Sequence, residues 1–267
     1  MLIAQISDCH IVDPGELFAD RTDSADGLRR AVDTVQRLPV TPDLVLLTGD
    51  LVNDGTPSQY DHLVSLLDGL DMPLLPIPGN HDDRGQLRER FASVLPHGRP
   101  DEPIDVVYDL GALRVVALDT TIPGRHDGAL TDAQLDWLDA QLAEMPDTPT
   151  IVAQHHPPIS SGIVWMDGDN GFATGRGEHE ILSRHRHVEA VVSGHLHRSL
   201  QRRFAGTVSV TCPSTAGALG LGLFGGPVEY STEPTGMLLH HWRDDAGLVS
   251  HVVPIGRFDT WSPSWAT

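Results

Sequence analysis

The sequence predicts an α/β fold, a layered sandwich with mixed β-sheets, from two observations. Short aliphatic and β-branched runs alternate with helical patterns through the first three quarters of the 267 residues. Such alternation implies helices packed on both faces of a sheet. A hairpin pattern also interrupts this order, with runs at 105–110 and 112–119 around Gly111. We therefore expect antiparallel strands beside parallel ones.

Six buried strands are expected in this order along the chain. Each is a short apolar run without helical spacing, as in strands covered on both faces. The runs are residues 2–7, 44–48, 74–78, 115–119, 150–154 and 188–193. Apolar residues at helical spacing follow the first and second strands, at 28–38 and 60–67, so a helix is expected at each place.

Two helix starts carry their own signals. Thr56 followed by Pro57 fits an N-cap and the first helical position. Thr131 and Gln134 have the spacing of a capping box, in which each side chain satisfies the other residue's backbone N–H. A third helix is therefore expected from residue 132 onward.

The sequence changes character from about Val210. Residues 216–227 are rich in Gly and Pro, which are poor helix formers. The segment also carries a large apolar load, which an isolated tail would not tolerate well: Leu219, Leu221, Leu223, Phe224, Trp242, Phe258, Trp261 and Trp265. We expect a catalytic domain at 1–209 and a cap or dimerisation segment at 210–267. This segment follows the last metal-type motif, so it is not expected to be needed to form the metal site. The alternative is that this segment completes the core of the same domain.

Composition excludes several classes of function. Hydrophobic content of 40% and charged content of 21% are those of an ordinary globular protein. A formal charge of −19 repels polyanions, so no nucleic acid duplex is expected as a partner. Only Cys9 and Cys212 are present, too few for a disulfide framework. No signal peptide or membrane span is visible, so a cytoplasmic protein without a membrane partner is expected.

The residues typical of metal sites fall directly after predicted strands, where α/β sheets place their ligand sites. The clusters are Asp8 with His10, Asp50, Asn80 with His81, His155 with His156, and His195 with His197. A single Asp-x-His is typical of a solvated strand end. Five clusters of carboxylate, imidazole and amide at strand ends indicate a metal site instead. Asp8 and His10 are two apart, so in extended chain they point to one side and Cys9 to the other.

The remaining histidines are interpreted as surface or structurally satisfied side chains: His62, His97, His126, His179, His185, His187, His240, His241 and His251. Asp13, Asp20 and Asp23 are interpreted in the same way, as loop or cap residues.

The ordered set of clusters resembles the calcineurin-like metallophosphoesterase superfamily, whose pattern is D-x-H, G-D-x-x, G-N-H-[DE], a lone His and G-H-x-H. The match spans roughly residues 2–198. It looks closest to the bacterial class III cyclic-nucleotide and glycerophosphodiester phosphodiesterases, apart from Cys9 in place of their common Thr. The resemblance implies an αββα sandwich of two mixed sheets flanked by helices. It also implies a homodimer or higher oligomer, with the C-terminal segment at the subunit contact. Together with the loop at 165–172, this segment is expected to narrow access to the metals.

The resemblance further implies two divalent metal ions held by seven residues: Asp8, His10 and His197 on one ion, Asn80, His155 and His195 on the other, and Asp50 between them. A carboxylate is suited to bridging two cations. Mixed nitrogen and oxygen ligation favours Fe, Mn, Zn or Co.

The expected chemistry is attack on phosphorus by a metal-activated hydroxide, since bound cations lower the pKa of water towards about 7. His81 is the candidate for protonating the leaving oxygen or contacting phosphate, with Asp82 as its orienting partner. Asn80, His81 and His156 are the candidate substrate contacts. For His156 the alternative is that it merely supports His155.

A small phosphodiester, of the glycerophosphodiester or 3′,5′-cyclic nucleotide type, is the expected substrate. The protein phosphatases that share the pattern carry an arginine in G-D-x-V-D-R-G, whereas residues 49–55 here read Gly-Asp-Leu-Val-Asn-Asp-Gly. Without that guanidinium, a monoester dianion loses a bidentate partner. The alternatives are a phosphomonoesterase or nucleotide phosphatase, and a non-catalytic scaffold on the same fold.

Overall fold

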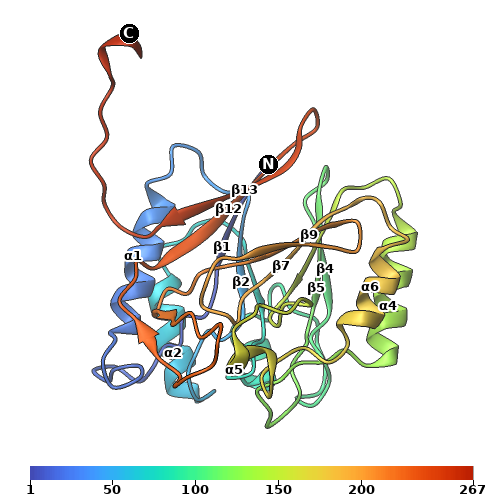
Figure 1. Ribbon diagram of the computed structural model, residues 1–267, viewed down its shortest axis with the longest axis horizontal. Coiled ribbons are helices and arrows are strands. Elements are labelled where there is room, and N and C mark those ends of the chain that lie inside the picture. Colours follow the sequence, from blue (N-terminus) through green and yellow to red (C-terminus); the bar gives the residue numbers. More distant parts are fainter. Residues whose placement is uncertain (267) are drawn as a thin grey trace.

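Two large β-sheets pack face to face, with helices on their outer faces (Figure 1). The structure is a computed structural model and describes residues 1–266. The first sheet has the order β13-β12-β1-β2-β3. Its strands are β1 (Leu2–Ile6), β2 (Leu44–Thr48), β3 (Leu74–Ile77), β12 (Gly236–Arg243) and β13 (Gly247–Pro254).

The second sheet has the order β4-β5-β6-β7-β9-β8. Its strands are β4 (Val106–Asp109), β5 (Arg114–Leu118), β6 (Thr150–Gln154), β7 (Val188–Ser193), β8 (Gln201–Phe204) and β9 (Thr207–Thr211). A small third sheet pairs β10 (Ala218–Leu219) with β11 (Tyr230–Ser231).

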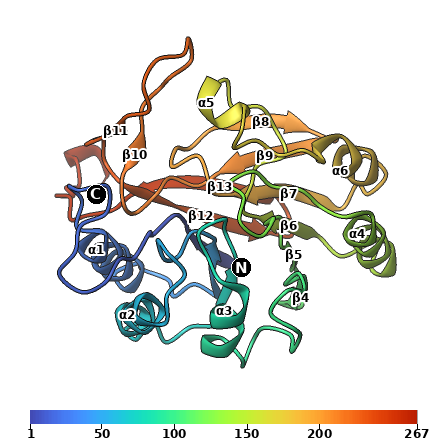
Figure 2. The ribbon, with the colours of Figure 1, turned by 90° about the horizontal axis from the view of Figure 1, so that it is seen from below.

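Helices cover both outer faces of the sandwich. In Figure 2, α1 (Ser24–Gln36), α2 (Pro57–Leu67) and α3 (Arg84–Arg90) lie on one side, and α4 (Asp132–Glu144) and α6 (Gly175–Leu182) lie on the other. Two shorter helices are α5 (Val164–Asp167) and the 3-10 helix at Ser264–Ala266. The predicted αββα sandwich of two mixed sheets is confirmed, including the hairpin of β4 and β5.

Side chains of β5 show how the layers are held together. Successive residues of a strand point to opposite faces, and all four of the following are buried. Val115 and Ala117 belong to the main core, together with residues of α1 and α2. Val116 and Leu118 belong to a second core, under α4 and α6. The second sheet is thus covered on both faces, which explains why its strands are continuously apolar.

The predicted helix starts are confirmed. The Thr56 side chain accepts a hydrogen bond from the backbone N–H of Gln59 at the start of α2. Thr131 and Gln134 form the capping box at the start of α4.

A buried polar network joins the two sheets directly behind the strand ends. The Gln5 amide donates to Thr48 Oγ1 at 2.9 Å and to the Ser193 carbonyl at 3.0 Å. Gln5 Oε1 lies 2.8 Å from His240 Nε2, so His240 donates there. Because Thr48 and Ser193 end β2 and β7, this network fixes the relative position of the two loops that follow.

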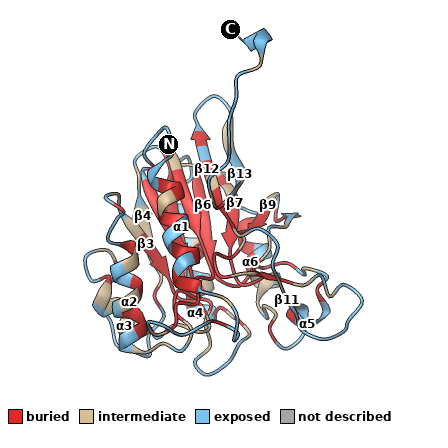
Figure 3. Cartoon of the chain, turned by 90° about the vertical axis from the view of Figure 1, so that its left-hand side faces the viewer, coloured by how far each residue is buried: buried red, intermediate tan, exposed pale blue. Residues whose placement is uncertain are grey.

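The C-terminal segment is divided between core and surface. The expected boundary at residue 210 falls inside β9, and β12 pairs antiparallel with β1 in the first sheet. Met237, Leu238 and Trp242 are buried there, as expected if this part of the segment completes the core of the same domain. Leu221, Leu223, Phe224, Phe258, Trp261 and Trp265 are exposed, and the chain beyond β13 extends away from the body (Figure 3).

Among residues 1–266, no helix is both long enough and apolar enough to cross a membrane.

Candidate metal centre

The five clusters of metal-type residues meet at one edge of the sandwich. They follow β1, β2, β3, β6 and β7, and within each sheet these strands run parallel. Carboxyl ends of parallel strands share one edge, so the loops that follow them come together. They surround a pocket of about 130 Å³. Its lining includes His10, Asp50, Asn80, His81, His126, His195, His197 and Tyr230.

One group of potential ligand atoms comes from Asp8, His10 and His197. The Nε2 atoms of His10 and His197 lie 3.0 Å apart, and His197 Nε2 lies 3.6 Å from Asp8 Oδ1. All three residues are buried.

A second group forms around His155. Its Nε2 lies 3.1 Å from Asn80 Oδ1 and 3.4 Å from Asp50 Oδ2. The same Asp50 Oδ2 lies 3.6 Å from His10 Nε2 in the first group. One carboxylate oxygen is therefore shared between the two groups. His195 closes this side, with its ring 5.0 Å from that of His155.

The backbone at these residues is unusual. Asp8, His10, Asp50, His195 and His197 have φ between 43° and 69°, in the left-handed region that non-glycine residues rarely adopt. Such strain collects at functional sites, where the surrounding fold enforces it. The expectation that Asp8 and His10 converge through extended chain is wrong, because both residues turn the chain. Cys9 nevertheless lies in the core, away from the group.

Two glycines allow the loops to approach one another. Gly49 has φ of 88°, and a Cβ there would collide with the His155 ring and with Gly79. A Cβ at Gly194 would collide with Ser7 and with the Asp8 carboxylate. These collisions explain the glycine that precedes Asp50 and the one that precedes His195.

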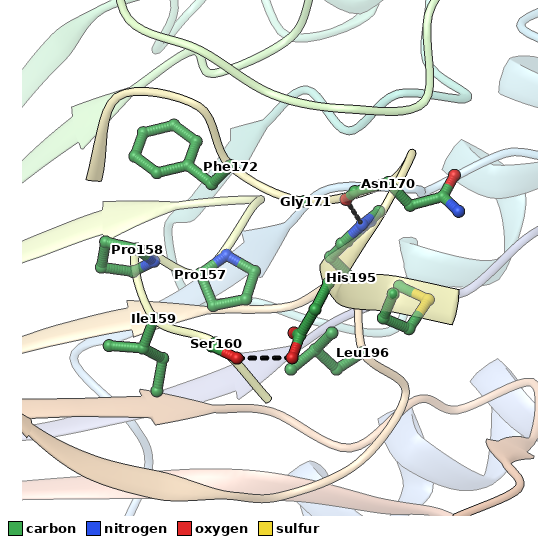
Figure 4. A pocket seen from close by; sticks show the side chains of 11 residues that line it. Pro157, Pro158, Ile159, Ser160, Asn170, Gly171, Phe172, His195 and Leu196 are labelled. Carbon is green, nitrogen blue, oxygen red and sulfur yellow. Dashed lines mark hydrogen bonds between the residues drawn. The ribbon is translucent and has the colours of Figure 1, made fainter. Parts of the chain in front are cut away.

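Backbone oxygens orient the imidazoles. His155 Nδ1 donates to the Thr48 carbonyl at 2.8 Å, and His197 Nδ1 donates to the Gly217 carbonyl at 2.9 Å. Each ring therefore directs Nε2 into the pocket. His195 is reversed, since its Nε2 donates to the Asn170 carbonyl at 2.8 Å, visible in Figure 4. Its Nδ1 is then the available ligand atom.

The C-terminal segment takes part in this construction, contrary to the expectation from sequence. Besides the bond from His197 to Gly217, the Ser214 hydroxyl donates to the Asp8 carbonyl at 2.7 Å. Ser214 lies beside Ser7 in a parallel bridge. The role of Ser214 and Gly217 could not be predicted from the sequence, because neither residue belongs to a metal-type motif.

His81 lies in the pocket with one ring nitrogen engaged. Its Nδ1 donates to the Asn53 carbonyl at 2.7 Å, and its backbone N–H donates to Asp50 Oδ1 at 2.9 Å. Its ring edge faces His10, with 4.8 Å between centroids. The remaining nitrogen, Nε2, is the atom that can reach a substrate.

Asp82 does not orient His81, so that prediction is wrong. Both of its oxygens are occupied elsewhere, by the backbone N–H groups of Leu51, Val52 and Gly79 and by the Tyr60 hydroxyl. Asp82 therefore fastens the loop that carries Asp50 to the loop that carries Asn80. Burial raises its pKa to about 6.

His156 is fully buried and supports the site from behind. Its Nε2 donates to the His126 carbonyl at 3.0 Å, so Nδ1 accepts from the Thr120 hydroxyl at 2.8 Å. Burial lowers its pKa to about 3. With both nitrogens engaged and no exposed surface, His156 is incompatible with the predicted substrate contact. The alternative, a supporting role, agrees with its position.

Two residues at the pocket were missed from sequence. His126 Nδ1 lies 3.2 Å from Asn80 Nδ2, although His126 was interpreted as a surface residue. Tyr230 lies beside His197, at 5.8 Å between ring centroids. Both come from segments without a metal-type motif, so the sequence offered no signal for either.

The electrostatics of the group suit cations. Burial alone would raise the pKa of Asp50, but His155 and His81 hold it well below its ordinary value. Burial alone would lower the pKa of His155, but Asp50 raises it to about 9. A cation must displace that proton, since only neutral imidazole ligates. Burial holds the pKa of His10 and of His195 well below the ordinary value, which keeps both rings neutral.

The donor set fits two metal ions. It offers imidazole nitrogen, carboxylate oxygen and one amide oxygen in two groups with a shared carboxylate, as mixed-ligand sites for transition metals do. The His10 ring is held by stacking on Phe18, at 4.5 Å between centroids, while its buried Nδ1 has no hydrogen-bond partner in the described part of the chain.

A second hollow, of about 170 Å³, lies behind His195 (Figure 4). It is bounded by Pro157, Pro158, Phe172 and the loop of α5. The Asp167 carboxylate closes that loop by accepting from Ser160, Ser161 and Gly162. Hydrogen bonds to Asp167 thus stabilise the loop that places the Asn170 carbonyl against His195.

Fold and site together are those of a metal-dependent phosphoesterase. The family model of the calcineurin-like phosphoesterases matches residues 1–199, and the chain belongs to this family. Members of the family use a dimetal centre, and the His and Asp groups described above could bind metal.

Several curated bacterial proteins are similar over most of their length. A probable glycerophosphodiester phosphodiesterase from Arcobacter nitrofigilis is 31% identical over 261 residues, covering 97% of this chain and 95% of that protein. A probable cyclic nucleotide phosphodiesterase from Rhodococcus erythropolis is 34% identical over 263 residues, covering 95% and 83%. A cAMP/cGMP dual specificity phosphodiesterase from Mycobacterium tuberculosis is 31% identical over 266 residues, covering 97% and 81%.

Among solved structures, a dimetal phosphatase from Danio rerio has a TM-score of 0.66 at 16% identity, covering 96% of this chain and 99% of that one. This likeness shows the shared fold. The resemblance inferred from the sequence motifs is confirmed.

Proposed function

We propose that the protein hydrolyses small phosphodiesters, of the glycerophosphodiester or 3′,5′-cyclic nucleotide type, at a centre of two transition-metal ions. The observation that carries the proposal is Asp50 Oδ2, shared at 3.6 and 3.4 Å between His10 and His155. The curated relatives named as phosphodiesterases support the choice of reaction.

In this proposal Asp8, His10 and His197 hold one ion, Asn80, His155 and His195 hold the other, and Asp50 bridges them. The metals are drawn from Fe, Mn, Zn and Co because the ligand set mixes nitrogen and oxygen. When bound, the ions would supply a hydroxide nucleophile at neutral pH and neutralise charge that develops on the phosphate oxygens.

The chain's own residues orient the reaction. His81 would present Nε2 to the phosphate or to the leaving oxygen, since its Nδ1 is held by the Asn53 carbonyl. In its protonated form this imidazole can donate from Nε2, which is the requirement for a general acid. Asn80 lies against His126 at 3.2 Å, so His126 would limit the positions open to a substrate oxygen.

A diester is favoured over a monoester by the charge of the pocket. Within residues 1–266, none of the side chains that line it belongs to Lys or Arg. A monoester dianion therefore has no guanidinium partner there, whereas a diester carries one negative charge less.

The test compares matched aryl substrates after loading with each of the four metals. kcat/KM for bis(p-nitrophenyl) phosphate should exceed that for p-nitrophenyl phosphate. Equal or greater monoester turnover would move the protein to the phosphomonoesterase or nucleotide phosphatase alternative. Absence of turnover on either substrate with every metal would favour the scaffold.

We also propose that the protein is a homodimer or higher homo-oligomer. Leu221, Leu223 and Phe224 form an exposed apolar group on the Gly-rich loop, with Phe224 fully exposed. Surfaces of this kind mark association sites. A cytoplasmic location is part of the proposal and is supported by two buried free cysteines, Cys9 and Cys212, which are typical of reducing compartments. Light scattering on the metal-loaded protein tests the oligomeric state.

A further inference from the structure

An apolar hollow of about 240 Å³ lies beside the metal pocket, between α5 and the Gly-rich loop at 219–229. Trp165 and Leu219 line both the hollow and the metal pocket. The hollow is therefore adjacent to the place where the phosphate would bind. Its other walls include Ile163, Val164 and Val228.

The hollow is fixed relative to the candidate ligands. Ile163, Met166 and Leu219 pack with Leu196 in one buried cluster, and Leu196 stands between His195 and His197 in the chain. The backbone N–H of Val164 donates to the Gly222 carbonyl at 3.2 Å. This bond joins the α5 wall to the loop wall, so the two walls hold a fixed separation.

The chemistry of the walls selects the kind of group that can enter. Apolar side chains and glycine backbone make up most of the lining, and Glu229 is its one charged residue, which disfavours an anion. The Trp165 side chain is 44% exposed. In the described chain its indole has no ring partner and its N–H has no acceptor. Its face is thus available for stacking.

We propose that this hollow is the subsite for the organic group of the diester, and that it takes a planar ring, a nucleobase, stacked on Trp165. The inference rests on the proposed function and selects one of its two substrate types. A flexible, polar glycerol group gains little from a flat apolar wall, whereas every base offers a π-face. The protein should therefore prefer 3′,5′-cyclic nucleotides to glycerophosphodiesters.

The experiment measures kcat/KM for 3′,5′-cyclic AMP and for glycerophosphoethanolamine with the same metal loaded. Trp165→Ala should lower the ratio of cyclic AMP to glycerophosphoethanolamine turnover by roughly ten- to a hundredfold, from the loss of one base stack. Trp165→Phe should restore most of the ratio because it keeps an aromatic face. Trp261→Ala, at an exposed tryptophan of the C-terminal tail, is the matched control and should leave the ratio unchanged.

A second variant fills the hollow without removing Trp165. A Cβ at Gly222 would meet only Ile163, at 3.9 Å, so Gly222→Leu can extend into the space without a backbone clash. It should also lower the ratio, because the base is excluded. Equal ratios for wild type, Trp165→Ala and Gly222→Leu would overturn the inference, and so would a wild-type preference for glycerophosphoethanolamine. Those results leave diester hydrolysis itself intact, whereas failure to cleave any diester would refute the proposed function instead.

Discussion

His197 Nδ1 donates a 2.9 Å hydrogen bond to the Gly217 carbonyl, which ties the last metal-type motif to the segment that follows β9. Further along, β12 of the same segment pairs with β1, the strand that leads to Asp8. The C-terminal quarter of the chain therefore supports the candidate centre from two directions.

A chain ending after Thr211 should fail to fold. It loses β12 and with it the buried side chains of Met237, Leu238 and Trp242, each of which contributes a few kcal/mol by burial, about 1.5–3 for a Leu or Met. A chain ending after Ile255 should keep its thermal midpoint within a few degrees, because Phe258, Trp261 and Trp265 are exposed. Thermal unfolding by circular dichroism distinguishes the two. Cooperative unfolding of the shorter chain would show that β12 is dispensable.

Metal-loaded wild-type protein should contain two ions per chain, and Asp50→Ala should reduce this number more than any other single ligand change. Asp50 Oδ2 is shared between both groups, so its removal affects both ions. The loss in kcat/KM should exceed the roughly 10–100-fold typical of residues that only orient ligands. Metal analysis after gel filtration supplies the count. Saturation at one ion in the wild type would contradict the shared-carboxylate arrangement.

His81→Ala should lower kcat by roughly 10²–10⁴-fold with both metal ions retained, as expected for loss of an acid or of a phosphate contact. The Nδ1 atom of His81 is held by the Asn53 carbonyl, and its Nε2 has no hydrogen-bond partner among the described residues. His251→Ala, on the exposed face of β13, serves as the control. If His81→Ala instead loses metal and recovers full turnover when metal is added, His81 has a structural role only.

Above about pH 6, where the buried carboxyls of Asp82 and Asp105 have largely titrated, the fold should continue to lose stability through the buried carboxyl of Glu178. Burial raises its pKa to about 8 from an ordinary 4.5, so the folded protein holds a proton that the unfolded chain releases. The favourable contribution is complete below about pH 4.5 and is lost as pH rises to about 8. The slope is about 1.4 kcal/mol per pH unit.

Glu178→Gln should remove the Glu178 part of that dependence and leave the part due to Asp82 and Asp105, since it keeps a side chain of the same shape and removes one titration. Denaturant unfolding of wild type and variant between pH 5 and 8.5 measures the difference. Glu180→Gln, an exposed position on the same helix, is the control. Parallel pH profiles for wild type and Glu178→Gln would show that Glu178 is ionised in the folded protein.

The strands and the metal-type clusters were predictable because both are local patterns. Each buried strand is a short apolar run, and each cluster follows directly on such a run, so convergence of Asp8, Asp50 and His195 follows from the geometry of parallel sheets. The left-handed backbone at these residues was not predictable, since it is imposed by contacts between loops from different strands.

Other features depend on contacts between residues far apart in the chain. Asp82 was assigned to the neighbouring His81, but its oxygens are occupied by N–H groups around residue 51 and by Tyr60. His126 reaches the pocket through a loop without any motif. The pairing of β12 with β1 joins the two ends of the chain, and the local apolar pattern was equally compatible with a peripheral cap.

At five candidate ligand residues, the left-handed backbone conformation lowers the stability of the fold, while the side chain is needed for activity. A non-glycine residue in this region raises the free energy of the fold by roughly 1 kcal/mol, and glycine removes most of that strain. Asp50→Gly should therefore melt higher than Asp50→Ala although both are inactive. Glycine does not recover the wild-type stability, however, because the Asp8 and Asp50 carboxylates accept from the backbone N–H groups of His195 and His81. Loss of either carboxylate leaves a buried donor unpaired, at a cost of about 1–3 kcal/mol, which is larger than the strain that glycine relieves.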